Sequence, residues 1–338
     1  MKTLGILAVV GMAATVANAQ VGSPRDLYIM GDGSSEVYQS TLWAGFNDSG
    51  IHIDNPLWAG NGSAASLPAG YHPFSGSSET QFNSPYLASF GGLNNNFYVS
   101  GFGGTVEVDG NTGAFVRRFT NGYSLDNEID YTGNNIWVAD GNGTSLYNQS
   151  GAYMGVSLAG VGAGGGSLMT SNGTDLYVSG WNSSTIVKYN QLTNTIDTSW
   201  GVNGVMNVSG GQIQKLDFDS FGNLYYATLY GSITSNGLYR VNANGTGDAQ
   251  VCNALIAETM FPGQMVTGWH GFEFGPDGNI YFAGQYGDVW VYRADGSFVG
   301  RLIQIDTKLT DVNFKPVPAP GALSVLGLGA LAARRRRR

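Results

Sequence analysis

The middle of the chain consists of short apolar or alternating segments separated by turn residues. Its clearest unit, residues 272–303, has the order strand, Pro-Asp-Gly-Asn turn, strand, loop, strand, Asp-Gly turn and strand. The turns carry Gly, Asn and Asp, which tolerate positive φ angles. The period of two in these segments and the near absence of a helical period predict an all-β domain.

This four-strand layout repeats along the chain. It returns at residues 216–252, 168–200, 129–158 and 90–119, and in part at 25–40. An aromatic residue anchors the second strand of each copy: Tyr28, Tyr98, Trp137, Tyr177, Tyr225 and Tyr281. Successive anchors are 70, 39, 40, 48 and 56 residues apart, and four-stranded propeller blades take about 40–50 residues. The repeat therefore predicts a β-propeller of six blades.

Other repeat architectures fit less well, because a parallel solenoid needs shorter rungs and a sandwich does not repeat one four-strand unit. The 70-residue gap leaves seven blades as the alternative, since residues 42–86 hold either a long insertion or a degenerate extra blade. We expect the propeller to occupy residues 20–314, between an N-terminal segment at 1–19 and a C-terminal tail at 315–338.

The N-terminus has the three parts of a secretory signal peptide in the expected order. Met1 and Lys2 give a positive start, residues 4–16 form a compact apolar run, and Ala17 and Ala19 give a small-x-small cleavage pattern. The apolar run is short for a bilayer span, and polar sequence follows it. We expect cleavage after Ala19 and export of the remaining chain.

The C-terminus combines a proline-spaced segment, an uncharged apolar run at residues 321–333 and five final arginines. As a helix, the apolar run would cover only about 20 Å of the roughly 30 Å hydrocarbon core. Arginines favour the cytoplasmic side, so the preceding domain is expected outside. A plain tail anchor is the alternative, whereas an arginine run that binds nucleic acid does not suit an exported acidic protein.

These features of the tail resemble the PEP-CTERM sorting signal of exported bacterial proteins. The residues that carry the resemblance are Pro318, Ala319, Pro320, Arg334, Arg335, Arg336, Arg337 and Arg338. The common form of the signal has glutamate where this chain has Ala319, which leaves open whether the tail is cleaved or retained. The resemblance implies an exosortase-type processing peptidase as partner, a tail transiently in the inner membrane, and a final location in the cell envelope or extracellular matrix.

Apart from its charged ends, the chain is strongly acidic. Lys2 and the five terminal arginines account for 6 of the 16 basic residues, which leaves 10 against 24 acidic residues and a net charge of −14. Such a surface disfavours nucleic acid and anionic lipid as partners, so membrane contact is expected only through the tail. The single Cys252 excludes a disulfide framework; we expect it to be buried, with an intermolecular bridge as the alternative.

Residues 270–281, with the sequence His-Gly-Phe-Glu-Phe-Gly-Pro-Asp-Gly-Asn-Ile-Tyr, resemble the blade opening of NHL-type and streptogramin-lyase-like propellers. The resemblance covers this copy well and the other copies loosely. It implies a structural motif, in which Asp-Gly-Asn closes a turn and the aromatic residue packs between blades. Streptogramin lyases use more than one histidine, and the repeats here contain only His270. The resemblance therefore indicates fold rather than activity.

Aligning the copies on their aromatic anchors brings three carboxylates to one position in three first strands: Asp130, Asp217 and Glu273. In a propeller the first strand of each blade lines the central channel. Carboxylates gathered there would bind a hard cation such as Ca²⁺, or would accept hydrogen bonds that tie neighbouring blades together. The same alignment gives three candidates for the channel mouth: His270, Gln214 and Glu128.

No motif of serine, cysteine or zinc hydrolases appears, and no cofactor other than Ca²⁺ is indicated. Loop aromatics such as Trp181 suit stacking on polysaccharide, or pack against blade ends. The first hypothesis is therefore a non-enzymatic binding or structural module for polysaccharide or protein. The alternative is a secreted divalent-metal-dependent propeller enzyme of lactonase or lyase type.

Overall fold

The computed structural model describes the chain from residue 25 to residue 314 with gaps. The described residues are 25–31, 36–42, 57–60, 72–73, 85–91, 96–101, 103–109, 115–120, 123–140, 143–158, 166–181, 183–262, 269–304 and 308–314. The expected signal peptide with Ala17 and Ala19 lies outside these residues. So does the expected sorting tail, with Pro318, Ala319, Pro320 and the arginines from Arg334 to Arg338.

Within the described ranges the strands form six β-sheets arranged around a central axis. The first sheet has the order β26 (Leu309–Phe314), β1 (Arg25–Gly31), β2 (Glu36–Leu42), β3 (Leu57–Gly60) and β4 (His72–Pro73). The second runs β5 (Pro85–Gly91), β6 (Asn96–Gly101), β7 (Gly104–Val108) and β8 (Phe115–Arg118). The third runs β9 (Asn127–Ile129), β10 (Asn135–Asp140), β11 (Gly143–Asn148) and β12 (Tyr153–Leu158).

The remaining three sheets repeat this meander. The fourth contains β13 (Ser167–Ser171), β14 (Asp175–Gly180), β15 (Thr185–Asn190), β16 (Thr195–Ile196) and β17 (Val205–Asn207). The fifth contains β18 (Ile213–Phe218), β19 (Leu224–Thr228), β20 (Gly237–Val241) and β21 (Asp248–Asn253). The sixth contains β22 (Trp269–Phe274), β23 (Asn279–Gly284), β24 (Asp288–Arg293) and β25 (Phe298–Gln304).

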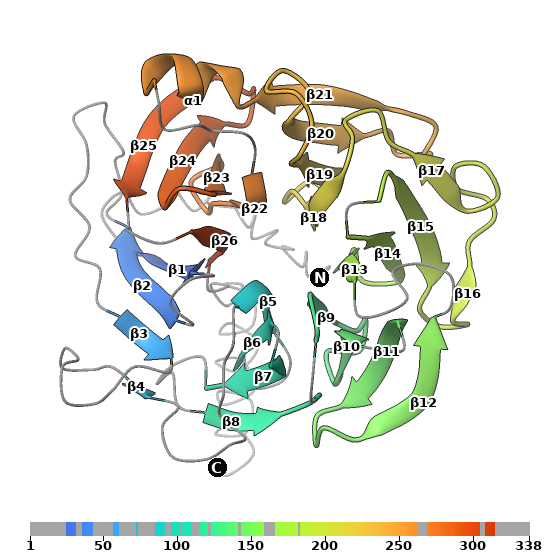
Figure 1. Ribbon diagram of the computed structural model, residues 1–338. Helices are drawn as coiled ribbons and strands as arrows, with labels where there is room; N and C mark the ends of the chain where they lie inside the picture. The colour runs from blue at the N-terminus through green and yellow to red at the C-terminus, as the bar shows by residue number, and fades with distance from the viewer. Residues whose placement is uncertain are drawn as a thin grey trace, which may run out of the picture.

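Figure 1 looks along the axis and places β26, β5, β9, β13, β18 and β22 nearest the centre. The chain is therefore an all-β propeller, as the repeat predicts. One short helix, α1 (Leu255–Met260), connects the fifth and sixth sheets. No helix within the described ranges is long and apolar enough to cross a membrane.

The last described strand closes the ring. β26 pairs antiparallel with β1, so that Asn313 lies opposite Tyr28 and Asp311 opposite Met30. The first sheet thus takes its innermost strand from the C-terminal end of the domain, which explains why the copy at residues 25–40 is only partial. The two described strands between residues 42 and 86, β3 and β4, join this same sheet through β2.

Aromatic side chains fill the space between neighbouring sheets. Between the fifth and sixth sheets the Tyr225 ring packs against the Phe274 ring, with centroids 4.9 Å apart. Within the sixth sheet the fully buried Trp269 stacks on Phe282 at 4.0 Å. Burying aromatic surface of this size from both sides is what holds adjacent sheets face to face. Cys252 is a free, buried member of this cluster, in agreement with the expected apolar role, and burial raises the pKa of its thiol.

An aspartate closes the hairpin between the first two strands in three of the sheets, at Asp130, Asp219 and Asp277. Asp219 accepts hydrogen bonds from the backbone N–H groups of Phe221 and Asn223, both at 2.9 Å. It also accepts the hydroxyl of the anchor Tyr225 at 3.2 Å, just as Asp277 accepts that of Tyr281 at 2.8 Å. The expected turn is confirmed here, and so is packing of the aromatic residue between sheets, since the Tyr281 ring lies edge-on to Phe314 of the first sheet with centroids 4.9 Å apart.

Replacing Asp219 with alanine is expected to lower the free energy of unfolding by about 1–2 kcal/mol, because several turn and anchor donors lose their acceptor together. The measurement is urea unfolding of the purified protein. Asp295→Ala is the matched control, since Asp295 lies in an exposed turn and accepts only from the N–H and hydroxyl of Ser297. An equal effect of both changes would show that the anchor hydroxyl adds nothing.

Candidate functional site

Each innermost strand places one polar residue directly opposite the anchor aromatic of its neighbour. The six residues, here called the polar ring, are Ser89, Glu128, Thr170, Asp217, Glu273 and Asn313. All six line one cavity of about 300 Å³. Because every sheet contributes to the cavity wall, the cavity lies at the centre of the propeller.

Lys215 and Asp311 form a buried ion pair beside the polar ring. The Lys215 Nζ lies 2.7 Å from Asp311 Oδ1 and 3.7 Å from Glu273 Oε2. The Asp311 side chain is fully buried and that of Lys215 is 8 % exposed. Asp311 also accepts the Ala88 N–H at 3.1 Å, which ties the first sheet to the second. This pair therefore links the fifth, first and second sheets across the channel.

Gly271 makes this ion pair possible. It lies on β22, between the strands that carry Lys215 and Asp311, and it is one of the residues at a bulge in that strand. A Cβ atom at this position would overlap Asp311 Oδ1 and approach the Asp311 Cα to 2.8 Å. A glycine at this point leaves room for the carboxylate that Lys215 reaches.

Five buried or half-buried carboxylates share the single ammonium group of this region: Asp126, Glu128, Asp217, Glu273 and Asp311. Burial raises the pKa of Asp126 and of Glu128 to about 8, and that of Asp217 to about 6. Burial likewise raises the pKa values of Glu273 and Asp311. For Lys215 burial alone would lower the pKa, but the surrounding carboxylates, Asp311 first, raise it above its ordinary value.

Two of these carboxylates have structural partners, and one keeps an oxygen without any. Asp126 accepts the Met169 N–H at 2.7 Å and so ties the third sheet to the fourth, while Asp311 does the same between the first and second. Asp217 uses Oδ1 to accept the N–H of Phe218 at 2.7 Å. Its Oδ2 is excluded from solvent and has no hydrogen-bond partner within the described ranges.

The structure separates the three carboxylates that the alignment groups together. Asp217 and Glu273 do share the cavity, but Asp130 does not line it. Asp130 lies in the turn after β9 and accepts from Thr132, Asn134 and Asn135. Its place in the ring belongs to Glu128, which pairs with Trp137, because this hairpin is one residue longer than those of the fifth and sixth sheets.

Glu128 therefore belongs to the cavity rather than to the channel mouth. Among the residues that the structure describes, no three His, Cys, Asp or Glu side chains are grouped so that they could hold a metal ion. The prediction that Asp130 lies with Asp217 and Glu273 is therefore wrong. The third carboxylate beside these two is Glu128.

His270 and Gln214 occupy equivalent positions at the start of the inner strands, as the alignment predicts. Each sits at a register shift, between Trp269 and Gly271 and between Ile213 and Lys215. Since the inner strands run from this end towards the polar ring, the two residues mark the opposite end of the channel from Asp217 and Glu273.

Aromatic residues surround these two positions and form what we call the aromatic mouth: Tyr86, Trp181, Gln214, Tyr230 and His270. Tyr86 and Tyr230 approach the His270 ring edge-on, with centroids 6.2 and 6.4 Å away. Trp181 donates its Nε1 proton to Gln214 Oε1 at 2.9 Å and packs edge-on against Tyr86. Sequence reasoning singles out Trp181 as a loop aromatic but misses Tyr86 and Tyr230, whose proximity depends on the closed ring.

Tyr230 is the exposed member of the mouth, with 54 % of its surface accessible. Its φ angle is +68°, a conformation that costs a bulky side chain about 1–3 kcal/mol. The following loop is fixed, because Gly231 N–H donates to Asn236 Oδ1 at 2.7 Å and Asn236 Nδ2 donates back to the Gly231 carbonyl at 3.2 Å. The fold thus holds an exposed aromatic ring at the channel mouth in an unfavourable backbone conformation.

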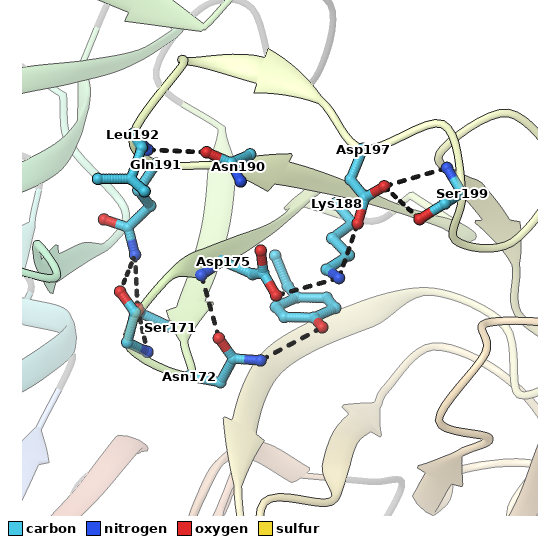
Figure 2. A network of polar contacts seen from close by, with 11 residues as sticks. Ser171, Asn172, Asp175, Lys188, Asn190, Gln191, Leu192, Asp197 and Ser199 are labelled. Atoms are coloured by element: carbon cyan, nitrogen blue, oxygen red, sulfur yellow. Dashed lines mark hydrogen bonds and ion pairs between the residues drawn. The ribbon is translucent and has the colours of Figure 1, made fainter.

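The polar network of the fourth sheet, shown in Figure 2, joins the strands of that sheet and reaches the wall of the central cavity at Ser171. Lys188 bridges Asp175 at 3.0 Å and Asp197 at 2.8 Å. Gln191 donates to Ser171 Oγ at 2.7 Å and accepts the Trp137 indole N–H at 2.9 Å, which joins the fourth sheet to the third. A second cavity of about 250 Å³ lies beside this network, between the fourth and fifth sheets.

Comparison with known proteins supports the fold alone. No protein-family model matches the chain, and no curated protein matches it. A crystal structure of a protein of unknown function from Bacteroides caccae is similar over 87 % of this chain and 100 % of that chain, with 12 % identity and a TM-score of 0.52. The C-terminal WD40 domain of Sif2 aligns over 87 % of this chain and 76 % of that one, with 13 % identity and a TM-score of 0.42. The chain is thus similar in fold to the Bacteroides caccae protein.

Proposed function

We propose that this chain is an exported six-bladed propeller of the bacterial cell envelope or extracellular matrix that binds polysaccharide without transforming it. The signal-like residues 1–19 support export. The PEP-CTERM-like tail at 315–338 supports handling by an exosortase-type peptidase, with the tail transiently in the inner membrane. The acidic surface argues against nucleic acid as a partner.

The observation that carries the binding role is the position of Tyr230. An exposed tyrosine in a strained conformation beside a buried histidine is costly for stability, and such costs concentrate where a side chain serves a ligand. Flat aromatic rings with polar neighbours suit the apolar faces and hydroxyl groups of sugars. Tyr230 and the partly exposed Trp181 would supply the rings, and the buried Tyr86, Gln214 and His270 would hold them in place. A protein ligand at the same mouth is the second form of this hypothesis.

Replacing Tyr230 with glycine is expected to weaken glycan binding at least ten-fold while leaving the protein equally or more stable. Glycine adopts a positive φ without steric cost, so the change relieves about 1 kcal/mol of strain and removes the ring. The purified protein is applied to a glycan array, and the best glycan is then titrated by calorimetry. Urea unfolding of both proteins gives the stability comparison.

Tyr153→Ala is the matched control, because Tyr153 is equally exposed, at 52 %, on the outer strand β12. It should bind the glycan as the unchanged protein does. Unchanged binding by the Tyr230→Gly variant would remove the mouth from the site. Binding of no glycan by the unchanged protein would overturn the polysaccharide proposal itself.

The second candidate function is a divalent-metal-dependent lactonase or lyase, favoured by the three carboxylates of the polar ring. Calcium prefers six to eight oxygen ligands. Glu128, Asp217 and Glu273 carry such oxygens, but in this conformation they are not grouped closely enough to hold an ion, so binding would require the side chains to move together. If Ca²⁺ binds the folded protein, millimolar calcium should raise the melting temperature relative to chelator. A melting temperature that does not change between the two conditions would reject the metal site and this enzyme class with it.

A further inference from the structure

We propose that the cavity of the polar ring binds a small organic cation through a primary ammonium group. This site lies at the opposite end of the channel from the aromatic mouth, and it does not depend on the glycan role proposed for that mouth. Its ligand class is a primary amine on a small polar skeleton, as in an amino sugar or a short diamine.

The cavity is lined by more acidic than basic side chains. Among the described residues, Lys215 is the one cationic side chain lining the cavity, and the side chains of Asp126, Glu128, Asp217 and Glu273 line it as well. Lys215 pairs mainly with Asp311, at 2.7 Å, and approaches Glu273 at 3.7 Å. Within the described ranges the other carboxyl groups have no cation within about 4 Å, so a cation that enters the cavity would favour their ionised form and be bound by it.

One carboxylate oxygen of Asp217 has no hydrogen-bond partner among the described residues. A buried carboxylate oxygen normally has a hydrogen-bond donor, yet Asp217 Oδ2 has none within the described ranges and is excluded from solvent. Asp217 lines the cavity, so a donor brought in by a ligand would meet this requirement once the carboxyl group rotates to turn Oδ2 towards the cavity. An ammonium group offers three such donors and forms the short, strong bonds typical of charged pairs.

The size of the cavity and the spread of its acidic groups suit a small molecule better than a single ion. The ring carboxylates stand on the third, fifth and sixth sheets, so they are spread around the cavity wall. The volume of about 300 Å³ exceeds that of one ion and lies at the lower end of the range of small-molecule sites. Thr170 and Asn313 add neutral polar groups to the wall. A ligand with a charged amine and a body of several polar atoms fits these features together.

The test compares two ligands that differ only in the amino group, D-glucosamine and D-glucose, by calorimetric titration of the purified protein at pH 7. Glucosamine should bind at least ten-fold more tightly than glucose. Putrescine tests whether the sugar body contributes to binding. An affinity comparable to that of glucosamine indicates that the ammonium group alone is recognised. A lower affinity indicates that the hydroxyl groups contribute as well. Both results support the proposal.

Asp217→Asn keeps Oδ1 for the Phe218 N–H and removes the charge, so it should lose at least ten-fold in glucosamine affinity while remaining folded in urea unfolding. Asp295→Asn, in an exposed turn, is the matched control and should bind normally. Equal affinity for glucose and glucosamine would overturn the proposal, and so would unchanged binding by Asp217→Asn.

Tyr230→Gly separates this site from the glycan role. If the proposal holds, glucosamine binding survives this change even when binding of the array glycan is lost. Loss of glucosamine binding in Tyr230→Gly would assign the amine to the aromatic mouth and overturn the cavity proposal, while the glycan proposal would stand.

Discussion

Replacing Lys215 with methionine is expected to lower the free energy of unfolding at pH 7 by about 3–5 kcal/mol. The change keeps most of the side-chain volume but leaves Asp311, which is fully buried, without its cation. A buried carboxylate without a partner must either remain charged at high cost or take up a proton. The same carboxylate also joins the first sheet to the second by accepting the Ala88 N–H. A displaced Asp311 side chain would therefore also weaken the contact between these two sheets. Urea unfolding at pH 7 measures the loss.

Two further variants show whether the loss arises at the ion pair. Lys188→Met removes another lysine with two carboxylate partners, but Asp175 and Asp197 are 17 % and 24 % exposed, so water compensates and about 1 kcal/mol is expected. The double change of Lys215→Met with Asp311→Asn should recover more than half of the stability, because the unpaired charge disappears. A loss below 1 kcal/mol in Lys215→Met alone would show that Lys215 is not the counter-ion that the fold depends on.

The fold was accessible from the sequence because each sheet repeats a local pattern. The anchor aromatics and the Asp-Gly-Asn turns identify the second strand without any long-range information, and Tyr281 with Asp277 shows both in one hairpin. The equivalence of His270 and Gln214 follows in the same way, since both precede an anchor by the same number of residues. Local hydrogen bonding and strand alternation were sufficient for this part.

The composition of the channel was only partly accessible, for two physical reasons. Hairpins differ in length: the ring residue precedes its anchor by eight residues at Asp217 and Glu273 but by nine at Glu128. An alignment that assumes one fixed spacing therefore passes over Glu128 and takes Asp130, seven residues before Trp137, in its place. The strand β26 has no copy of its own, and its residues Asp311 and Asn313 enter the channel only when the ring closes. The alternating sequence of residues 309–314, Leu-Thr-Asp-Val-Asn-Phe, was the available signal.

The pairing of Lys215 with Asp311 could not be predicted from either strand. It requires that the fifth and first sheets face each other past the sixth, and that Gly271 leaves the intervening space open. Neither condition can be predicted from the sequence of a single strand or hairpin. Contacts across the axis of a propeller depend on the number and curvature of all the sheets, so they appear only in the assembled ring.

The stability of this protein is expected to fall as pH rises from 5 to 8, which is the reverse of ordinary acid denaturation. The pKa values of Asp217, Glu128 and Asp126 are raised in the folded state, to about 6 for the first and about 8 for the other two. These groups hold protons more tightly when folded than when unfolded. Their contribution is therefore fully present below about pH 4 and is lost as pH rises through 6 and then 8.

The expected loss is about 2–3 kcal/mol for Asp217 alone, since each pKa unit corresponds to about 1.4 kcal/mol. At the acidic end Asp197 acts in the opposite direction: hydrogen bonding to Lys188 lowers its pKa to about 2, so its contribution disappears only as pH falls towards that value. The two effects together place maximum stability near pH 4. Urea midpoints measured at pH 5, 6.5 and 8 give the profile directly.

Single variants assign the slope to its residues. Asp217→Asn should flatten the profile between about pH 4 and 6 and stabilise the protein at pH 7, because the amide keeps the Oδ1 acceptor for Phe218 without the buried charge. Glu128→Gln should flatten it between about pH 4.5 and 8. If the stability of the unchanged protein increased from pH 5 to 8, the expected pKa shifts would be wrong. The channel carboxylates would then be ionised and paired with a bound cation throughout this range. The amine proposed for the polar ring would have the same effect when added, so saturating putrescine, whose amino groups remain charged at pH 8, should raise stability most at that pH, where the carboxylates repel one another most strongly.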